Sequence, residues 1–500
     1  MKRGRTLLAI ALIVALLATA GTQKLALNER HKLLKTPAGS SSTTSLANMD
    51  SFALALLLGG MRGPLVMFLW MQSETQKQAK DLEGIETQIE WIRLLQPEFD
   101  TVHLFQIWNK AYNLSAQMAS LANKYSVILD AIEYAQNVER QRPDNVNILM
   151  SLANIFNDKL AGSTEKYYYR KRILQDTQYR PADHVARAPG SRPTRYPSLL
   201  DPQGMIKPEL LAPRLFEKDR KGEYYDGSEL QFLAGYQPFP YGVPAYGLAY
   251  NYYKRSQVLQ RTTGQRHIQI AEMVLDSRPA LCLRAWFEVE WDSGVRAELQ
   301  LFGQSAPVDR FAAIAAGGKF DPASLGAEQL KQNKAVFDET IYRNKYALKL
   351  IDAADAAFRE HLAIPDFQMH VDMYRSHMEH LAASKFMIIA DLNMLEAATA
   401  QGEAKAKLLA GARVAYLQAI RQYQIMRLRY FTSEEYEKDM YPSGLTRWNL
   451  EIATDAQIAA LIKEAERRNA LNTYDVYADD TIEFQSYVSR ATNRLAMLPK

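Results

Sequence analysis

Residues Leu409–Tyr430 read LAGARVAYLQAIRQYQIMRLRY, and this stretch decides the fold. A large side chain recurs every seven residues, at Leu409, Tyr416, Tyr423 and Tyr430, and a smaller or flexible one follows three positions later, at Ala412, Ala419 and Met426. A sustained period of 3.5 residues is typical of helices that pack like a coiled coil. Rings alternating with alanines suit an antiparallel hairpin, so we expect the partner helix to run from about Asp366 to Ala400, with the turn at Gly402.

Further helices are predicted on both sides of this hairpin. One apolar stripe consists of Phe337, Ile341, Leu348 and Ile351. Two capping boxes predict helix starts nearer the C-terminus, one at Thr454 with Gln457 and one at Asp480 with Glu483. The segment from 326 to 500 is therefore predicted to be a C-terminal α-helical bundle.

Helical hairpins are also predicted between residues 64 and 176. Apolar residues at helical spacing mark four helices: Ile85, Ile89, Ile92 and Leu95; Leu104, Ile107, Trp108, Ala111 and Tyr112; Tyr125, Ile128, Leu129 and Ile132; Leu149, Leu152, Ala153 and Phe156. The helix pairs end before Pro97 and Pro143, which is similar to the tetratricopeptide (TPR) pattern. The two prolines are 46 residues apart, whereas the repeat has about 34, so a generic α-bundle stays open as an alternative.

This part of the chain resembles a known group of proteins. The resemblance rests on Gly59–Gly63, on Phe68-Leu69-Trp70, on Trp91 and on the run Phe105–Ser115. It covers roughly residues 52–175 and points to an uncharacterised bacterial family with an N-terminal hydrophobic segment followed by TPR-like helices. The resemblance implies an architecture and no particular activity.

Residues 177–325 change in character. Seven prolines between Pro181 and Pro213 preclude a continuous helix, while the aromatic residues of 236–253 argue against disorder. We expect an extended segment that lies across the helical layers and holds itself there with its rings. Gly247–Arg255 can begin a helix, and Leu281–Phe302, which mixes strand and helix signals, is interpreted as helix.

The N-terminus has the pattern of an export signal. Lys2, Arg3 and Arg5 precede an apolar run from Leu7 to Leu17, and Ala18-Thr19-Ala20 fits a cleavage site. The predicted organisation is a signal peptide or signal anchor at 1–21, a flexible tether at 22–50, a TPR-like helical domain at 51–176, a Pro/aromatic-rich wrapping segment with short helices at 177–325 and the bundle at 326–500. We expect a protein of the cell envelope, anchored in the inner membrane and facing the periplasm, or exported.

A second apolar stretch runs from Phe52 to Met71. Arg62 and the breakers around Gly63-Pro64 interrupt its centre, and an unpaired arginine in the middle of a bilayer is costly. We interpret it as two buried helical pieces around a tight turn, with a membrane-embedded segment as the alternative.

Composition narrows the chemistry. A formal net charge of +4 over 500 residues does not indicate a nucleic-acid binder. One cysteine, Cys282, cannot form an internal disulfide or a thiolate zinc cluster, and its apolar neighbours indicate a small buried residue. Nucleophile and phosphate-binding motifs are absent from the sequence: Gly303–Pro307 fails the G-x-S-x-G pattern at its last position, and Gly317–Phe320 lacks the features of a P-loop. We expect no cofactor, and a non-enzymatic protein is favoured over an enzyme.

Histidines suggest one chemical alternative. His377 and His380 are spaced by one helical turn and could hold a metal together, with His370 nearby. His370 lies seven residues from His377, about 10.5 Å along a helix axis at 1.5 Å per residue, which is too far to share an ion unaided. The alternative interpretation is a polar helix face.

A basic, tyrosine-rich stretch runs from Lys166 to Arg195. It could bind an anionic lipid or an envelope polymer, or it could be a solvated loop. Trp70, Trp91, Trp108 and Tyr112 are candidates for a partner-binding groove or for the core. The leading functional hypothesis is a non-enzymatic scaffold that binds a protein or peptide, and the alternative is a metal-binding protein or enzyme that acts on an envelope substrate through the helix of His370, His377 and His380.

Overall fold

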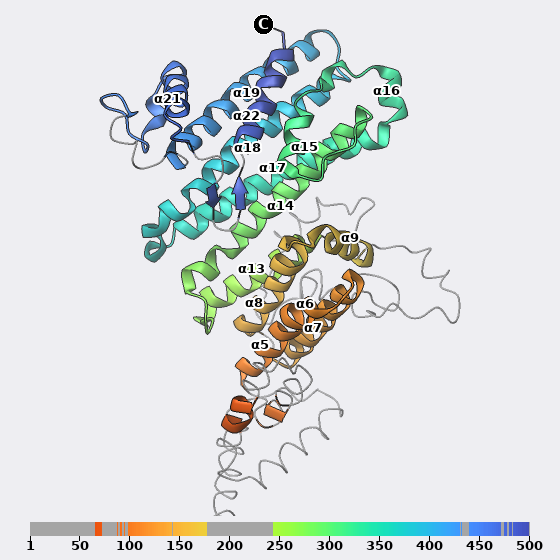
Figure 1. Ribbon diagram of the computed structural model, residues 1–500, viewed down its shortest axis with the longest axis vertical. Coiled ribbons are helices and arrows are strands. Elements are labelled where there is room, and N and C mark those ends of the chain that lie inside the picture. Colours follow the sequence, from red (N-terminus) through yellow and green to blue (C-terminus); the bar gives the residue numbers. More distant parts are fainter. Residues whose placement is uncertain are drawn as a thin grey trace, which may run out of the picture. The chain divides into compact units, whose positions relative to one another are not determined.

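The protein is described from a computed structural model, which defines residues 66–72, 88, 91–92, 95, 99–142, 144–177, 244–430, 432, 440–471, 475–477, 480–482 and 484–499. The fold is all-α, as predicted, with one short hairpin in which β1 (Asp475–Tyr477) pairs antiparallel with β2 (Asp480–Ile482) (Figure 1). The predicted leader, tether and wrapping residues at 1–50 and 178–243 lie outside the described residues.

The chain divides into two compact units. The first comprises Met1–Tyr169 and Ala182–Gln203, and the second comprises Arg170–Pro181 and Gly204–Lys500. The labelled helices at the N-terminal side are α5 (Asp100–Trp108), η2 (Asn109–Leu114), α6 (Ser115–Gln117), α7 (Leu121–Gln141), α8 (Val146–Asn154), η3 (Ile155–Gly162) and α9 (Lys166–Thr177), the last of which crosses the boundary.

Helix α7 organises the first unit. It packs against α5, η2 and α8, and it turns inward the predicted residues Tyr125, Ile128, Leu129 and Ile132, which are at most 2 % exposed. Ser120 caps its start by accepting a hydrogen bond of 3.1 Å from the N–H of Asn123. The predicted face of the next helix, from Leu149 to Phe156, is also buried. The inward faces predicted for α7 and for the helix after it are confirmed, Ile85 and Ile89 of the first predicted helix lie outside the described residues, and the TPR repeat stays a prediction.

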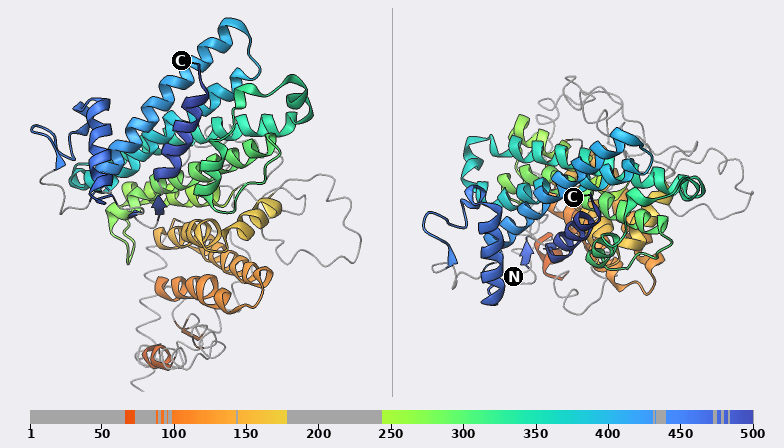
Figure 2. Two further views of the ribbon diagram at one scale, coloured as in Figure 1. Left: turned by 45° about the horizontal axis from the view of Figure 1, so that its top comes forward. Right: turned by 90° about the horizontal axis from the view of Figure 1, so that it is seen from above.

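The second unit is a bundle of long helices. Its helices are α13 (Ala245–Thr263), α14 (Glu272–Leu301), α15 (Arg310–Gly317), η4 (Pro322–Ser324), α16 (Ala327–Gln332), α17 (Lys334–Leu362), η5 (Pro365–His370), α18 (Val371–Ala397), α19 (Gly402–Tyr430), η7 (Leu450–Ile452), α21 (Asp455–Arg467) and α22 (Phe484–Met497). The closest pairs are α14 with α17 and α18 with α19, and α13 covers α14 (Figures 1 and 2). The ambiguous segment Leu281–Phe302 lies almost entirely in α14, so its helical interpretation is confirmed.

Helices α18 and α19 form the predicted antiparallel hairpin. The chain reverses at Gly402, whose φ of 54° lies in the left-handed region that glycine adopts without strain. Ala412, Tyr416, Ala419 and Tyr423 are fully buried. The Tyr416 hydroxyl donates to Asp391 on α18 at 2.6 Å, so the rings both fill space and satisfy their polar ends.

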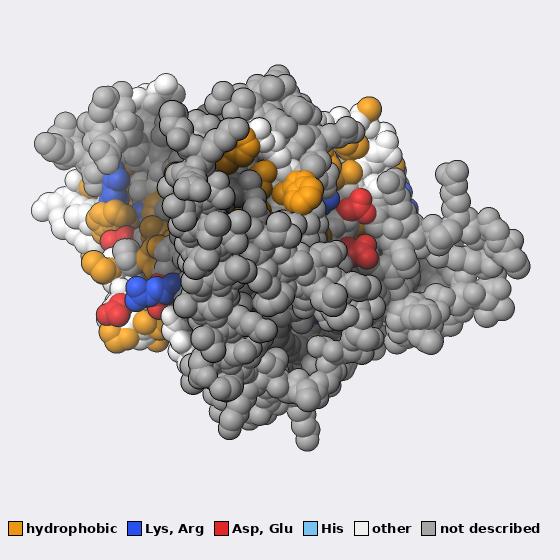
Figure 3. Space-filling model, turned by 90° about the horizontal axis from the view of Figure 1, so that it is seen from below, with side chains coloured by type: hydrophobic (Ala, Val, Ile, Leu, Met, Phe, Trp, Pro, Cys, Tyr) orange, Lys and Arg blue, Asp and Glu red, His pale blue; other side chains and the backbone are white. Residues whose placement is uncertain are grey.

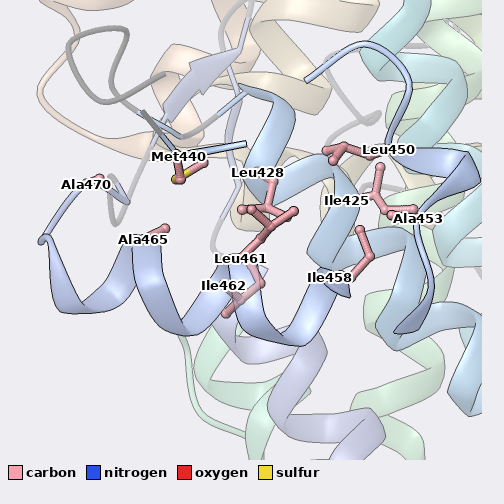
Figure 4. Close-up of a cluster of buried hydrophobic side chains, with 10 residues drawn as sticks. All are labelled: Ile425, Leu428, Met440, Leu450, Ala453, Ile458, Leu461, Ile462, Ala465 and Ala470. Atoms are coloured by element: carbon pink, nitrogen blue, oxygen red, sulfur yellow. The ribbon is translucent and has the colours of Figure 1, made fainter. Parts of the chain in front are cut away.

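Helix α21 covers the end of α19 with a separate apolar cluster. Ile425 and Leu428 of α19 point toward Ile458, Leu461 and Ile462 of α21 (Figure 4). The capping box predicted at Thr454 is confirmed, because Gln457 N–H donates to its hydroxyl and the Gln457 side chain accepts from the Thr454 N–H. The second predicted box is wrong: Asp480 belongs to β2, and α22 begins only at Phe484. β-branched Thr481 and Ile482 favour the strand.

Helix α22 inserts two arginines into the bundle. Arg490 donates to Glu298 of α14 at 2.6 Å and to Asp391 of α18 at 3.1 Å, while Arg494 pairs with the same Glu298. All four residues are at most 1 % exposed. Helix α15 approaches α22 closely at Gly317 and Gly318, since a Cβ at Gly318 would lie 2.6 Å from the Arg490 Cα. Only a residue without a side chain fits there.

This contact gives a stability prediction. Gly318→Ala forces α15 away from the backbone of α22, and overpacking of this kind typically costs about 1–3 kcal/mol. We therefore expect a lower urea midpoint, measured by circular dichroism. Gly326→Ala is the matched control, because a Cβ there meets nothing within 4 Å. Equal midpoints for the two variants would contradict the close packing of α15 on α22.

Candidate functional site

The candidate site in the first unit is built on a small apolar core. Val66, Ile92, Leu95 and Val102 are buried together, and the partly buried Leu69, Trp70 and Phe105 pack on them. These residues come from the helical turn at 66–72, from helical residues between 88 and 95, and from α5. Three segments therefore share one core, and their other faces point outward.

Large apolar side chains occupy those outer faces. Six of them are exposed: Met67 (68 %), Phe68 (52 %), Met71 (65 %), Trp91 (48 %), Phe99 (44 %) and Trp108 (45 %). We call this set the apolar surface of the first unit. Figure 3 shows, on one face of the molecule, hydrophobic side chains that reach the surface beside charged ones. Where exposed apolar side chains form a contiguous patch, that patch typically marks an interaction site.

Aromatic contacts connect the core with this surface. The ring centroids of Trp70 and Phe105 lie 5.8 Å apart, edge to face, and those of Phe105 and Trp108 lie 6.1 Å apart. Trp108 is the last residue of α5, where the chain passes into the π-helical segment η2. Its position is thus fixed by packing on one side while nearly half of the side chain stays in solvent.

The four predicted partner-binding residues divide into two pairs. Trp91 and Trp108 belong to the apolar surface, whereas Trp70 and Tyr112 are partly buried. The Lys159 ammonium of η3 lies 5.9 Å from the centre of the Tyr112 ring, and burial together with the negative charge of Asp158 raises the Tyr112 pKa. Tyr112 therefore joins the two π-helical segments as a neutral phenol.

Sequence reasoning missed Met67, Phe68, Met71 and Phe99. A signal was present, because residues 66–71 read VMFLWM and are apolar on every helical face. Such a helix is either buried all round or leaves one apolar face uncovered. Only the structure shows that Val66 faces the core while Met67 and Phe68 do not.

The predicted histidine pair lies in the interior of the second unit. His377 Nδ1 is 3.1 Å from Nη1 of Arg284, and His380 Nδ1 is 3.6 Å from Glu288. The rings of Phe287, Tyr423 and Tyr487 surround His380 with centroids about 6 Å away. Burial, reinforced by the positive charge of Arg284, lowers the pKa of both imidazoles to about 3.

Metal binding at these histidines stays a prediction without support. Among the described residues, no group of three or more histidine, cysteine, aspartate or glutamate side chains is placed to hold a metal ion. The His370 side chain lies outside that description. The guanidinium of Arg284 beside His377 further disfavours a cation at this position.

Two other predictions concern single segments. Cys282 is buried, as expected, and its thiol lies 3.4 Å from the Tyr246 carbonyl oxygen.

The basic stretch begins in α9, where Tyr167 is exposed and Tyr169 is buried with its hydroxyl donating to Glu165 at 2.6 Å. Residues 178–195 of that stretch lie outside the described residues. Across the described part of the chain, every helix is too short or too polar to span a bilayer.

No family model matches the chain, and neither the curated proteins nor the solved structures contain a significant match.

The buried histidines give a prediction for pH dependence. Their folded pKa of about 3 lies below the ordinary value of 6.5, so between these values the unfolded chain binds protons that the folded chain does not. Stability should therefore fall as the pH drops below 6.5, by up to about 1.4 kcal/mol per pH unit for each histidine.

His380→Leu tests this expectation. Between pH 6.5 and pH 5 the Glu288 carboxylate stays ionised, because its pKa is lowered from 4.5, so a difference between the variant and the parent protein reports on His380. The ring nitrogens of His380 have no hydrogen-bond partner, so leucine leaves no partner unpaired. The variant should lose less of its pH 8 urea midpoint at pH 5 than the parent protein. Parallel curves for both proteins would contradict the assignment.

Proposed function

We propose that this protein is a non-enzymatic scaffold of the cell envelope that binds a protein partner through the apolar surface of its first unit. The observation that carries the proposal is the exposure of Trp91 and Trp108 on elements that share one core. Tryptophan is enriched among the residues that dominate binding energy at protein interfaces. Exposed tryptophans with neighbouring methionines and phenylalanines suit an apolar segment of a partner.

The surface is prepared for binding by its own packing. Phe105 contacts Trp70 and Trp108, so the exposed ring of Trp108 rests on a ring beneath it. A side chain that is already ordered loses less rotamer freedom when a partner covers it, which raises affinity. Met67 and Met71 lie on a neighbouring helical turn and add unbranched, adaptable contacts, and Phe68 adds a ring.

The location in the envelope is supported by the sequence. The basic and apolar pattern of residues 1–21 is typical of a signal or an anchor, and a polar, serine-rich tether separates it from the apolar surface. A retained anchor would keep this surface near a membrane, where it would meet membrane-bound partners at raised effective concentration.

The metal-dependent alternative is not part of the proposal. His377 and His380 are packed among aromatic rings, and their nearest polar neighbours are Arg284 and Glu288 of an ion-pair layer. These contacts make His377 and His380 part of a structural layer inside the bundle.

The apolar surface can be tested with a pair of substitutions. Trp91→Ala with Trp108→Ala should weaken capture of the partner at least tenfold, because loss of two interface tryptophans costs at least about 2 kcal/mol. The measurement is quantitative co-purification with tagged full-length protein from envelope fractions, followed by titration of the purified partner.

A matched control lies in the second unit. Trp448 is 47 % exposed, like the two test residues, and Arg375 lies 5.3 Å from its ring. Trp448→Ala should leave capture unchanged. Equal capture by all variants, or an equal loss in the control, would contradict the proposal. Binding of the parent protein to protein-free vesicles that the double substitution abolishes would assign the surface to lipid instead.

A further inference from the structure

The second unit contains a pocket with a volume of about 340 Å³. Its walls come from the start of α13, from one face of α14 and from α17, and Arg170 of α9 completes it; the lining residues that matter most are Tyr246, Glu290, Ser293, Arg296, Glu339 and Arg343. Ligand pockets typically measure roughly 300–1,000 Å³, so this one suits a small ligand. None of its lining residues belongs to the apolar surface of the first unit.

The polar groups of the pocket are held in place by one another. Arg343 of α17 pairs with Glu290 of α14 and donates from Nε to Glu339 at 2.6 Å. Glu290 is 2 % exposed and also accepts a hydrogen bond of 3.0 Å from the indole of Trp286. A group that is fixed in this way can bind a ligand without first reorganising.

The charges in and immediately beside the pocket balance. Three arginines line it, against Glu290 and Glu339, and Asp292 beside it accepts from Arg296 at 2.8 Å. Arg296 also donates to the carbonyl oxygens of Pro307 and Val308, so its charge is already used. Three positive and three negative side chains leave no net charge that would select an anion or a cation.

The remaining hydrogen-bonding capacity is mixed. Carboxylate oxygens accept, guanidinium groups donate, and the side-chain amide of Gln300 does both. The Ser293 hydroxyl donates to the Val289 carbonyl at 2.8 Å, which leaves its oxygen as an acceptor. Apolar groups of Val289, Ala297 and Tyr246 lie between these polar atoms. A ligand that matches this pattern carries several hydroxyl groups on a compact apolar ring.

We propose that this pocket binds a neutral, polyhydroxylated ligand of the size of a mono- or disaccharide. Each sugar hydroxyl both donates and accepts, so it can bridge a glutamate and an arginine that are already paired. The C–H faces of the ring cover the apolar part of the wall. A ligand with a net charge finds no excess of opposite charge among the three arginines and the three carboxylates in and beside the pocket.

The experiment uses the full-length protein and defined probes. N-acetylglucosamine and maltose represent neutral sugars, octanoate represents anions and putrescine represents cations. Saturation-transfer NMR detects binding, and calorimetry gives the affinity. We expect saturable binding of at least one sugar and no competition by octanoate or putrescine.

Two substitutions link binding to the pocket. Ser293→Leu fills the space from α14, and Glu339→Gln removes an acceptor charge while keeping the size of the side chain. Each should weaken sugar binding at least tenfold, and either one alone is decisive if the other does not fold. Glu396→Gln is the matched control. Glu396 of α18 pairs with Lys345 of α17 at 2.8 Å, and it does not line the pocket.

Three results would overturn the proposal: no sugar binding by the parent protein, unchanged affinity in both pocket variants, or binding of octanoate or putrescine in place of the sugars. Loss of binding in the Glu396→Gln control would also overturn it, because the effect would then not be local to the pocket.

Discussion

The second unit depends on carboxylates that α14 carries into the interior. Four of them are at most 6 % exposed, and each pairs with a cationic side chain of a different neighbouring helix: Asp276 with Arg261 of α13, Glu288 with Arg310 of α15, Glu290 with Arg343 of α17 and Glu298 with Arg490 of α22. Removing one partner of a buried pair leaves the other charge uncompensated, which costs about 3–5 kcal/mol. Each pair therefore specifies which helix lies at that level of α14, while apolar packing supplies most of the stability.

The need to pair buried charges also explains the second partner of Asp276. Asp276 is buried, and it also accepts from His361 of α17 at 2.7 Å, so that level of α14 is held from two sides. Burial alone would raise the pKa of this carboxyl, but its hydrogen bonds with His361 and Arg261 lower it instead. A charge that is paired in this way excludes other arrangements of the helices, because any other arrangement would leave the charge unpaired.

Sequence periodicity was sufficient for the helices and insufficient for these pairs. The seven-residue pattern of α19 predicted its buried rings because they lie on one face of one helix. Partners such as Arg343 with Glu290, or Arg490 with Glu298, are 53 and 192 residues apart, and no local pattern joins them. The sequence signal of helix α14 was ambiguous because the helix is buried on nearly all sides and its acidic residues interrupt the apolar pattern. The exposed face of residues 66–71 was hidden for the opposite reason, because a helix that is apolar all round does not show which side meets solvent.

The two units are informative in different ways. The second pairs the buried carboxylates of α14 with cationic side chains, whereas the first exposes Trp91 and Trp108 beside a buried apolar core. Val66, Ile92, Leu95 and Val102 fill that core without help from Trp91 or Met67. An exposed apolar surface carries an aggregation hazard that polar side chains would avoid. A protein partner that covered Trp91 and Trp108 would remove their apolar surface from water, a favourable contribution that their exposed positions leave unused in the isolated chain.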